Sequence, residues 1–154
     1  MDIISFEPAL RLFAAIVAGS LIGLNRDLHG KPTGVRLHAL VSLGAAIFTA
    51  AGIELASQDP AATSRIIQGI VGGIGFLGAG VIIRSEKGKH VHNLTTAACV
   101  WLTACVGAAC GVGQWRLLLI GAPIVAVILI FGGSFEKWVH RRWPAPDDMD
   151  NKIG

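Results

Sequence analysis

Residues 68–83 read QGIVGGIGFLGAGVII, an apolar run without charges that contains six glycines. In water, this much glycine would cost a helix roughly 1 kcal/mol per residue relative to alanine. In hydrocarbon an unpaired backbone group is costly, so the segment is forced to stay helical and its glycines become notches for a neighbouring helix. We therefore expect this helix to be the central, most enclosed element of a membrane bundle. The expected packing positions are Gly69, Gly72, Gly73, Gly75, Gly78 and Gly80.

The composition of the whole chain also indicates a membrane protein. Of 154 residues, 53% are hydrophobic and 15% are charged, and the mean hydropathy is +0.62. A soluble domain carries about a quarter charged residues. Here the charges separate five apolar runs, each near the length that crosses a bilayer. The predicted fold is an all-α polytopic bundle with transmembrane helices at about 8–24, 37–55, 66–83, 94–112 and 117–135.

The distribution of lysine and arginine predicts the orientation of these five spans. Ten of the 13 basic residues fall in the first loop, the third loop and the C-terminal segment, which lie on one side of the membrane. Because basic residues concentrate in cytoplasmic loops, the N-terminus is expected outside and the C-terminus inside. The transmembrane domain is expected to cover residues 1–143, followed by a polar, disordered cytoplasmic tail at 144–154.

Catalytic, metal and cofactor sites find little support in the sequence. Residues 73–78 match GxGxxG as text, but the match lies inside a membrane span and follows no strand, so it does not predict dinucleotide binding. Cys99, Cys105 and Cys110 share one apolar run and are interpreted as packing thiols. His90 and His92 in the third loop do not by themselves make a metal site. We predict no enzymatic activity, no cofactor, no metal and no nucleic-acid partner.

Four stretches occur in an order that resembles the MgtC/SapB family. They are residues 19–26 (GSLIGLNR), 31–38 (KPTGVRLH), 73–80 (GIGFLGAG) and 94–98 (LTTAA), the last followed by Trp101. The resemblance covers roughly residues 10–115. Two positions depart from it, because the family usually has Glu at Asn25 and Gly at Asn93. The chain is expected to hold the membrane part of the family without the ACT-like domain that some members carry.

The resemblance implies a multi-pass protein of the bacterial inner membrane, linked to magnesium limitation and stress. It favours a regulatory role through lateral contacts with other inner-membrane proteins, and we also expect a homo-oligomer, with a dimer favoured. The residues add one constraint. Magnesium prefers carboxylate ligands, yet no carboxylate falls near the middle of any predicted span; Glu54 is near an outer end, and Glu7 there can pair with Arg11.

Six polar residues are the candidates for function: Arg26, Arg36, His38, Gln68, Thr95 and Thr96. The two arginines can simply anchor the cytoplasmic ends of spans, or they can pack under the glycine helix and bind an anionic partner. The threonines can bond to their own helix or make a polar contact inside the bundle. Gln68 is expected to need a partner on another helix. The alternative function is a magnesium or small-solute transporter formed by an oligomer, with Arg36, Gln68, Thr95 and Thr96 around its path.

Overall fold

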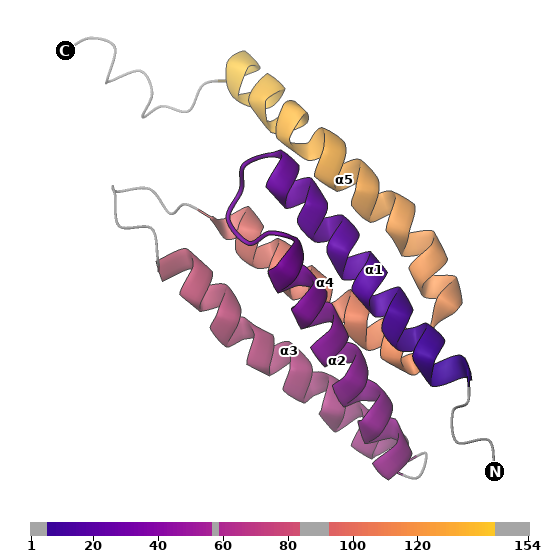
Figure 1. The fold of residues 1–154 in the computed structure, drawn as a ribbon. Helices are drawn as coiled ribbons and strands as arrows, with labels where there is room; N and C mark the ends of the chain where they lie inside the picture. The colour runs from indigo at the N-terminus through magenta and orange to yellow at the C-terminus, as the bar shows by residue number, and fades with distance from the viewer. Residues whose placement is uncertain (1–5, 57–58, 84–92, 144–154) are drawn as a thin grey trace. The chain divides into compact units, whose positions relative to one another are not determined.

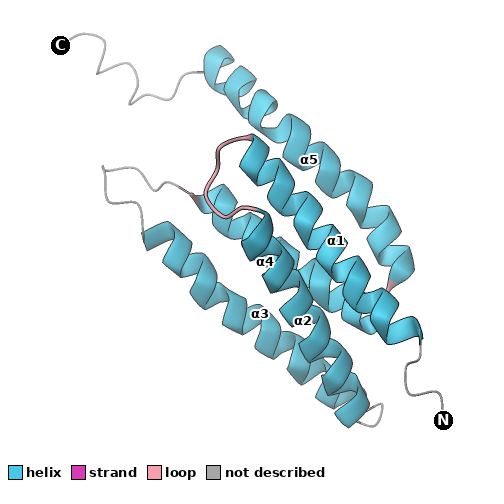
Figure 2. Cartoon of the chain, viewed as in Figure 1, coloured by secondary structure: helices cyan, strands magenta, loops and turns pink. Residues whose placement is uncertain are grey.

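The computed structural model describes residues 6–56, 59–83 and 93–143. These residues form α1 (Phe6–Leu28), α2 (Val35–Leu55), α3 (Pro60–Ile83), α4 (Leu94–Val112) and α5 (Trp115–Arg142), and they contain no strand (Figures 1 and 2). Each helix is long and apolar enough to cross a membrane. The predicted all-α fold with five membrane spans is therefore confirmed. The side on which each terminus lies stays a prediction.

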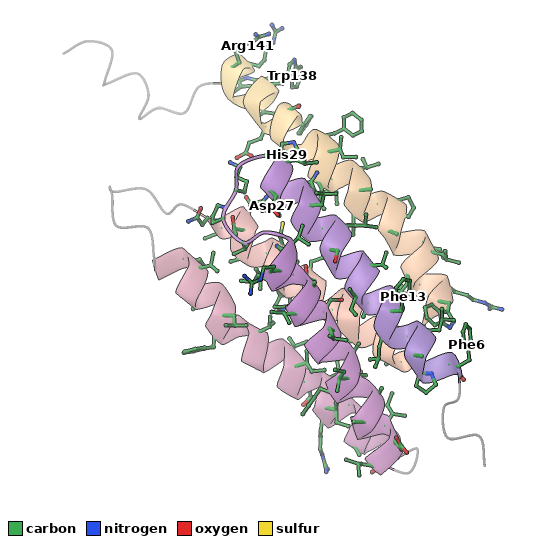
Figure 3. All side chains as sticks on the ribbon, in the orientation of Figure 1. Phe6, Phe13, Asp27, His29, Trp138 and Arg141 are labelled. Carbon is green, nitrogen blue, oxygen red and sulfur yellow. The ribbon has the colours of Figure 1, made fainter. Side chains whose placement is uncertain are left out.

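The bounds of α4 agree with the predicted span, whereas α1, α3 and α5 are longer than predicted. The side chain of Asp59 accepts a hydrogen bond from the Ala61 backbone N–H at 2.9 Å, so α3 begins ahead of its apolar part. Pro60 at the first helical position fits this start, because that position needs no N–H. At the other end of the chain, α5 continues through its basic and aromatic last turns, where Trp138 and Arg141 lie (Figure 3).

The contacts along the chain divide it into two units, Met1–Leu118 and Leu119–Gly154. The first unit holds α1 to α4 with the first residues of α5. The second unit holds the remainder of α5, where the rings of Phe135 and Trp138 stack with centroids 6.0 Å apart. All the functional residues considered below belong to the first unit.

Within the first unit, α4 and not the glycine-rich α3 is the most enclosed helix. α4 packs against α1, α2 and α3, whereas α3 packs against α2 and α4. In the α4 span 50% of the residues are buried, compared with 11% in the α3 span. One face of α3 enters the core, where Ile74 packs with Val100 and Ala104 of α4. The prediction that residues 68–83 form the central element is wrong, because only Gly78 of the six glycines has a neighbour within 4 Å, the Ala97 side chain of α4.

The closest approach of α1 to α2 occurs at two glycines four residues apart. A Cβ atom added to Gly19 would lie 2.5 Å from the carbonyl oxygen of His38. One added to Gly23 would lie 2.6 Å from the Cα atom of Val35. Both distances are far below van der Waals contact, so these positions admit no side chain without movement of the α2 backbone. This is the close packing that the GxxxG pattern permits in membranes.

Two glycines of α4 allow the same close packing against α2. A Cβ atom on Gly107 would lie 2.2 Å from the carbonyl oxygen of Ser42, and one on Gly111 would lie 2.5 Å from that of Ala46. Ser42 is also the residue that the Gly19 position of α1 approaches, with 2.7 Å to its Cβ atom. Three helices therefore meet around Ser42, and their backbones come together because two of them present glycine there.

Arg11 joins α1 to the last turn of α4. Its Nη1 atom donates to the carbonyl oxygen of Gly111 at 3.0 Å, and its Nη2 atom pairs with Glu7 one turn earlier. The predicted pair of Glu7 and Arg11 is thus confirmed. Just beyond, Gly113 takes the left-handed conformation with φ of 80° and ends α4.

Candidate functional site

One face of α2 is polar and entirely buried. His38, Ser42 and Thr49 occupy positions i, i+4 and i+11, which fall on one side of a helix, and each is 0% exposed. Thr96 and Thr103 of α4 are buried opposite them, at 2% and 0% exposed. A membrane protein gains nothing from burying hydroxyl and imidazole groups unless they are hydrogen-bonded. The bonds of this face therefore define the candidate site.

His38 is held by a threonine on α4. The Nδ1 atom of His38 lies 2.7 Å from the Thr103 hydroxyl oxygen, and that hydroxyl donates to the Cys99 carbonyl oxygen at 2.8 Å. A hydroxyl carries one hydrogen, so Thr103 accepts the bond from His38, which places a hydrogen on Nδ1. The other ring nitrogen, Nε2, lies 3.4 Å from the hydroxyl oxygen of Thr33. The imidazole is thus fixed between the first loop and α4.

Thr33 has an unusual backbone conformation for a β-branched residue. Its φ is 69°, in the left-handed region that threonine rarely occupies. Such strain persists where the surrounding structure imposes it, and it often accompanies functional sites. Here it brings the Thr33 side chain to the His38 ring at the point where the chain enters α2.

Arg26 lies beside this face, in the last turn of α1. Its side chain is 6% exposed, and its Nη2 atom donates to the Thr96 hydroxyl oxygen at 2.6 Å. The Nε atom is buried without a hydrogen-bond partner. The next residue, Asp27, is exposed and accepts a hydrogen bond from the Val35 backbone N–H at 3.0 Å. Asp27 and His29 mark this end of α1 in Figure 3, where the loop leads into α2.

The structure brings together three of the six polar residues that the sequence singled out. Arg26, His38 and Thr96 are buried among α1, α2 and α4. Arg36 and Thr95 are exposed, although each is within two residues of a buried one. Arg36 therefore does not share the buried position of Arg26, because it lies two residues before the buried His38 and on the other side of α2.

Gln68 differs from the prediction in its partner. It is exposed on α3, and its Nε2 atom donates to the Ser64 hydroxyl of the same helix at 3.3 Å, one turn earlier. The expected contact with another helix is not observed within the described residues. Arg36, Gln68 and Thr95 are exposed and Thr96 is buried, and the path that an oligomer would form around them stays a prediction.

The glycines of α3 face open space within the part of the chain that the structure describes. A Cβ atom would meet nothing within 4 Å at Gly69, Gly72, Gly73, Gly75 or Gly80. At Gly78 it would meet only the Ala97 side chain, at the ordinary contact distance of 3.8 Å. These residues do not serve as notches between α3 and its neighbours in the chain. Their role in packing against another protein stays a prediction.

The two departures from the family motifs have different structural settings. Asn93 precedes α4 with φ of 72°, a conformation that glycine adopts freely and asparagine better than other residues. The replacement of the family glycine is therefore compatible with the same backbone. At Asn25 the backbone carbonyl oxygen lies 2.7 Å from His29 Nδ1, and nothing in the structure explains the absence of the family glutamate.

The structure also bears on the candidates for metal and thiol chemistry. Among the described residues, no three His, Cys, Asp or Glu side chains come together as a metal site would require. His90, His92, Arg84 and the tail at 144–154 lie outside those residues. Cys99, Cys105 and Cys110 are free thiols, and Cys99 and Cys110 are buried in the helix contacts.

Sequence reasoning missed several residues that build the site. Ser42, Thr49 and Thr103 make the buried polar face, and Gly19, Gly23, Gly107 and Gly111 allow it to close. A signal existed for both sets. The polar residues of α2 fall on one helical face, and the two glycine pairs are spaced by four residues, which is the packing motif of membrane helices.

Comparison with known proteins places this arrangement in a family. The model of the MgtC family matches residues 12–138. The chain is 38% identical over 147 residues to Protein SrpB of Synechococcus elongatus, covering 88% of this chain and 81% of SrpB. It is 42% identical over 120 residues to Protein MgtC of Salmonella typhimurium, covering 78% of this chain and 50% of MgtC.

An uncharacterized protein of Haemophilus influenzae is 34% identical over 142 residues, covering 86% of this chain and 58% of that protein. No solved structure matches. The chain thus spans most of SrpB and about half the length of MgtC. With five spans of the expected order and a family match over most of its length, the chain is a multi-pass bacterial membrane protein that belongs to the MgtC family.

Proposed function

We propose that this protein is a regulatory protein of the bacterial inner membrane that acts through lateral contacts with other membrane proteins. Its link to magnesium homeostasis or stress is the one that the family resemblance implies. The observation that carries the proposal is the open outer face of α3. Gly69, Gly72 and Gly80 lie there, opposite the buried Ile74, and have no neighbour within 4 Å in the described chain.

Exposed leucine or phenylalanine in a membrane needs no explanation, because lipid tails are equally apolar. Exposed glycine is different. It offers lipid no side chain to contact, whereas it lets a second helix approach the backbone closely. Five such glycines within twelve residues of one helix are therefore better suited to a protein neighbour than to lipid.

The buried polar face of α2 also supports this proposal. His38 bonds to Thr103, Arg26 bonds to Thr96, and Thr49 donates to the Ala45 carbonyl oxygen at 2.7 Å, whereas the buried Ser42 hydroxyl has no hydrogen-bond partner among the described residues. The residues at its centre are at most 2% exposed, apart from Arg26 at 6%. No carboxylate takes part among the described residues. The face thus holds α1, α2 and α4 together while α3 remains available to a partner.

The proposal is tested by photocrosslinking from the outer face of α3. A photoreactive phenylalanine analogue replaces Phe76, which is 82% exposed on that face. Cells growing at limiting magnesium are irradiated, and the membranes are resolved by electrophoresis. We expect a discrete protein adduct that Gly72→Leu abolishes, because the leucine side chain blocks close approach. An adduct with the mass of two copies would identify the predicted homo-oligomer. An adduct of another mass would identify a different membrane protein as the partner.

The matched control places the same analogue at Phe13, which is 64% exposed on α1. Growth at low magnesium of a strain lacking the gene supplies the functional readout. The wild type and a Phe13→Leu variant should restore growth, and Gly72→Leu should not, although it inserts normally. Equal crosslinking from Phe13 and Phe76, or full growth with Gly72→Leu, would contradict the proposal.

A second candidate function is transport of magnesium or a small solute by an oligomer. The observation that favours it is the run of buried hydroxyl and imidazole groups from His38 to Thr49 along α2. About three turns of helix separate the ends of this run, so it covers about half of the hydrocarbon thickness. A transporter would need this face to open and admit water. Saturable flux through the purified protein is the result that would favour this candidate.

A further inference from the structure

Arg26 is a buried cation for which the described chain supplies no anion. It is 6% exposed, and its one side-chain hydrogen bond goes to the neutral hydroxyl of Thr96. Its Nε atom has no partner, and no described residue forms an ion pair with it. An isolated charge removed from water is strongly unfavourable, so such an arginine is normally found with a carboxylate or another anion.

Arg26 also faces the positive end of a long helix. Thr96 lies in the first turn of α4, a helix of 19 residues, and Arg26 reaches it with its guanidinium group. The residue before α4 is Asn93, whose side chain makes no capping hydrogen bond. The N–H groups of the first turn and the helix dipole therefore add positive potential beside the arginine.

The other helix that begins at this end shows what is missing from α4. Figure 1 places the end of α1 and the starts of α2 and α4 at one end of the first unit. The N-terminus of α2 has an anion, because the Asp27 carboxylate accepts from the Val35 N–H at 3.0 Å. α4 has no such carboxylate among the described residues, and it has the buried Arg26 in addition.

We infer that Arg26, Thr96 and the N-terminus of α4 bind a small oxyanion of the phosphate type. Helix N-termini bind phosphate through backbone N–H groups, and the planar guanidinium group of arginine donates to phosphate oxygens in pairs. The Thr96 hydroxyl oxygen, already bonded to Arg26, would hold the guanidinium group in position. The anion can be free inorganic phosphate or the headgroup of a phospholipid at this end of the spans.

This site is independent of the proposed contacts of α3, which lie on another face of the bundle. Loss of one would leave the other intact. The anion site concerns the end where α1, α2 and α4 meet, and its test uses purified protein without any partner.

The test measures the melting temperature of the full chain in a neutral detergent as sodium phosphate replaces sodium chloride at constant ionic strength. At a phosphate concentration one hundred times the Kd, we expect a rise of roughly 5–10 °C. Arg26→Gln should remove the rise. Arg36→Gln, which deletes an exposed charge nearby, should keep it. Equal responses of the two variants would overturn the inference, because they would indicate a general salt effect.

Two further measurements test the inference even if Arg26→Gln does not fold. The ³¹P resonance of phosphate should broaden when wild-type protein is added, and Thr96→Val should reduce the broadening more than Thr95→Val. For the lipid source, phosphatidylglycerol is added to the detergent and compared with diacylglycerol, which lacks the phosphate. Stabilisation by phosphatidylglycerol alone assigns the site to a headgroup, and stabilisation by phosphate assigns it to the free ion. Wild-type protein that responds to neither would overturn the inference.

Discussion

The two glycine-rich regions of the molecule behave in opposite ways. In α4, Gly107 and Gly111 lie against the α2 backbone, where an added Cβ atom would come within 2.2 Å and 2.5 Å of a carbonyl oxygen. In α3, Gly72 and Gly75 would accept a Cβ atom with nothing within 4 Å among the described residues. α3 has more glycine than α4, yet α4 is the enclosed helix.

The difference teaches that the number of glycines does not locate the packed interface of a membrane helix. What matters is whether the glycines share a face with residues that a neighbour can bond or pack against. Gly107 lies on the α4 face that carries Thr103, which bonds to His38. Five of the six α3 glycines instead have no neighbour within 4 Å in the described chain, and α3 enters the core through Ile74.

The largest expected effect is at the close contact between α4 and α2. Gly107→Leu forces α2 away from α4, and we expect it to lower the free energy of unfolding by about 3 kcal/mol or to prevent insertion. Gly75→Leu, its counterpart on α3, should melt within a few degrees of the wild type. Thermal melting of both variants in detergent makes the comparison. Similar destabilisation by the two would show that α3 is packed as tightly as α4.

The next prediction compares two neighbouring threonines of α4. Thr96→Val removes the hydroxyl that Arg26 contacts at 2.6 Å, and we expect a loss of about 2 kcal/mol because a buried charge loses its partner. Thr95→Val removes an exposed hydroxyl and should change stability little. The check is melting of both variants, together with Arg26→Gln in a double-mutant cycle. Additive effects of Thr96→Val and Arg26→Gln would speak against a direct interaction.

A smaller effect is expected at the bond that fixes His38. Thr103→Val leaves the His38 Nδ1–H without an acceptor, for a loss of about 1 kcal/mol. Nitrogen NMR of labelled histidine provides a second measurement. The wild type should show the hydrogen on Nδ1 of His38, and Thr103→Val should change this signal while leaving that of His29, whose Nδ1 atom faces the Asn25 carbonyl oxygen, unchanged. A His38 signal unchanged by Thr103→Val would contradict the bond.

The smallest effect on stability is expected at the exposed glycines of α3. Gly72→Leu on α3 should change the free energy of unfolding by less than about 0.5 kcal/mol, as at other exposed sites. If the α3 face also makes the predicted homodimer, the same variant should shift the protein to monomer in size-exclusion chromatography with light scattering. Dimer that persists in Gly72→Leu at wild-type strength would remove α3 from that interface.

The sequence alone was sufficient for the architecture because hydrophobic length is a local property. The span at 94–112 coincides with α4, and the helix count and the pair of Glu7 and Arg11 were also confirmed. The early start of α3 depended on Asp59 and Pro60, which cap a helix outside the apolar run. Apolarity alone does not report such extensions.

The site was only partly predictable because its contacts join distant residues. Arg26 meets Thr96 across 70 positions, and His38 meets Thr103 across 65. The family motifs pointed to Arg26, His38 and Thr96, but equally to exposed Arg36 and Thr95. Which of two adjacent polar residues turns inward depends on the rotation of each helix. That rotation depends on contacts such as those of Gly19 and Gly107 with Ser42, and the four-residue spacing of the glycines does not tell which helix each pair meets.

The most direct test of the account is magnesium flux into proteoliposomes that hold the purified, correctly inserted protein. A regulator that acts by contact, with a closed polar face among α1, α2 and α4, should give flux no greater than empty liposomes. The Arg26→Gln and Thr96→Val variants should give the same flat traces. Saturable magnesium flux in the wild type that either variant abolishes would contradict the account and identify the buried face as a transport path.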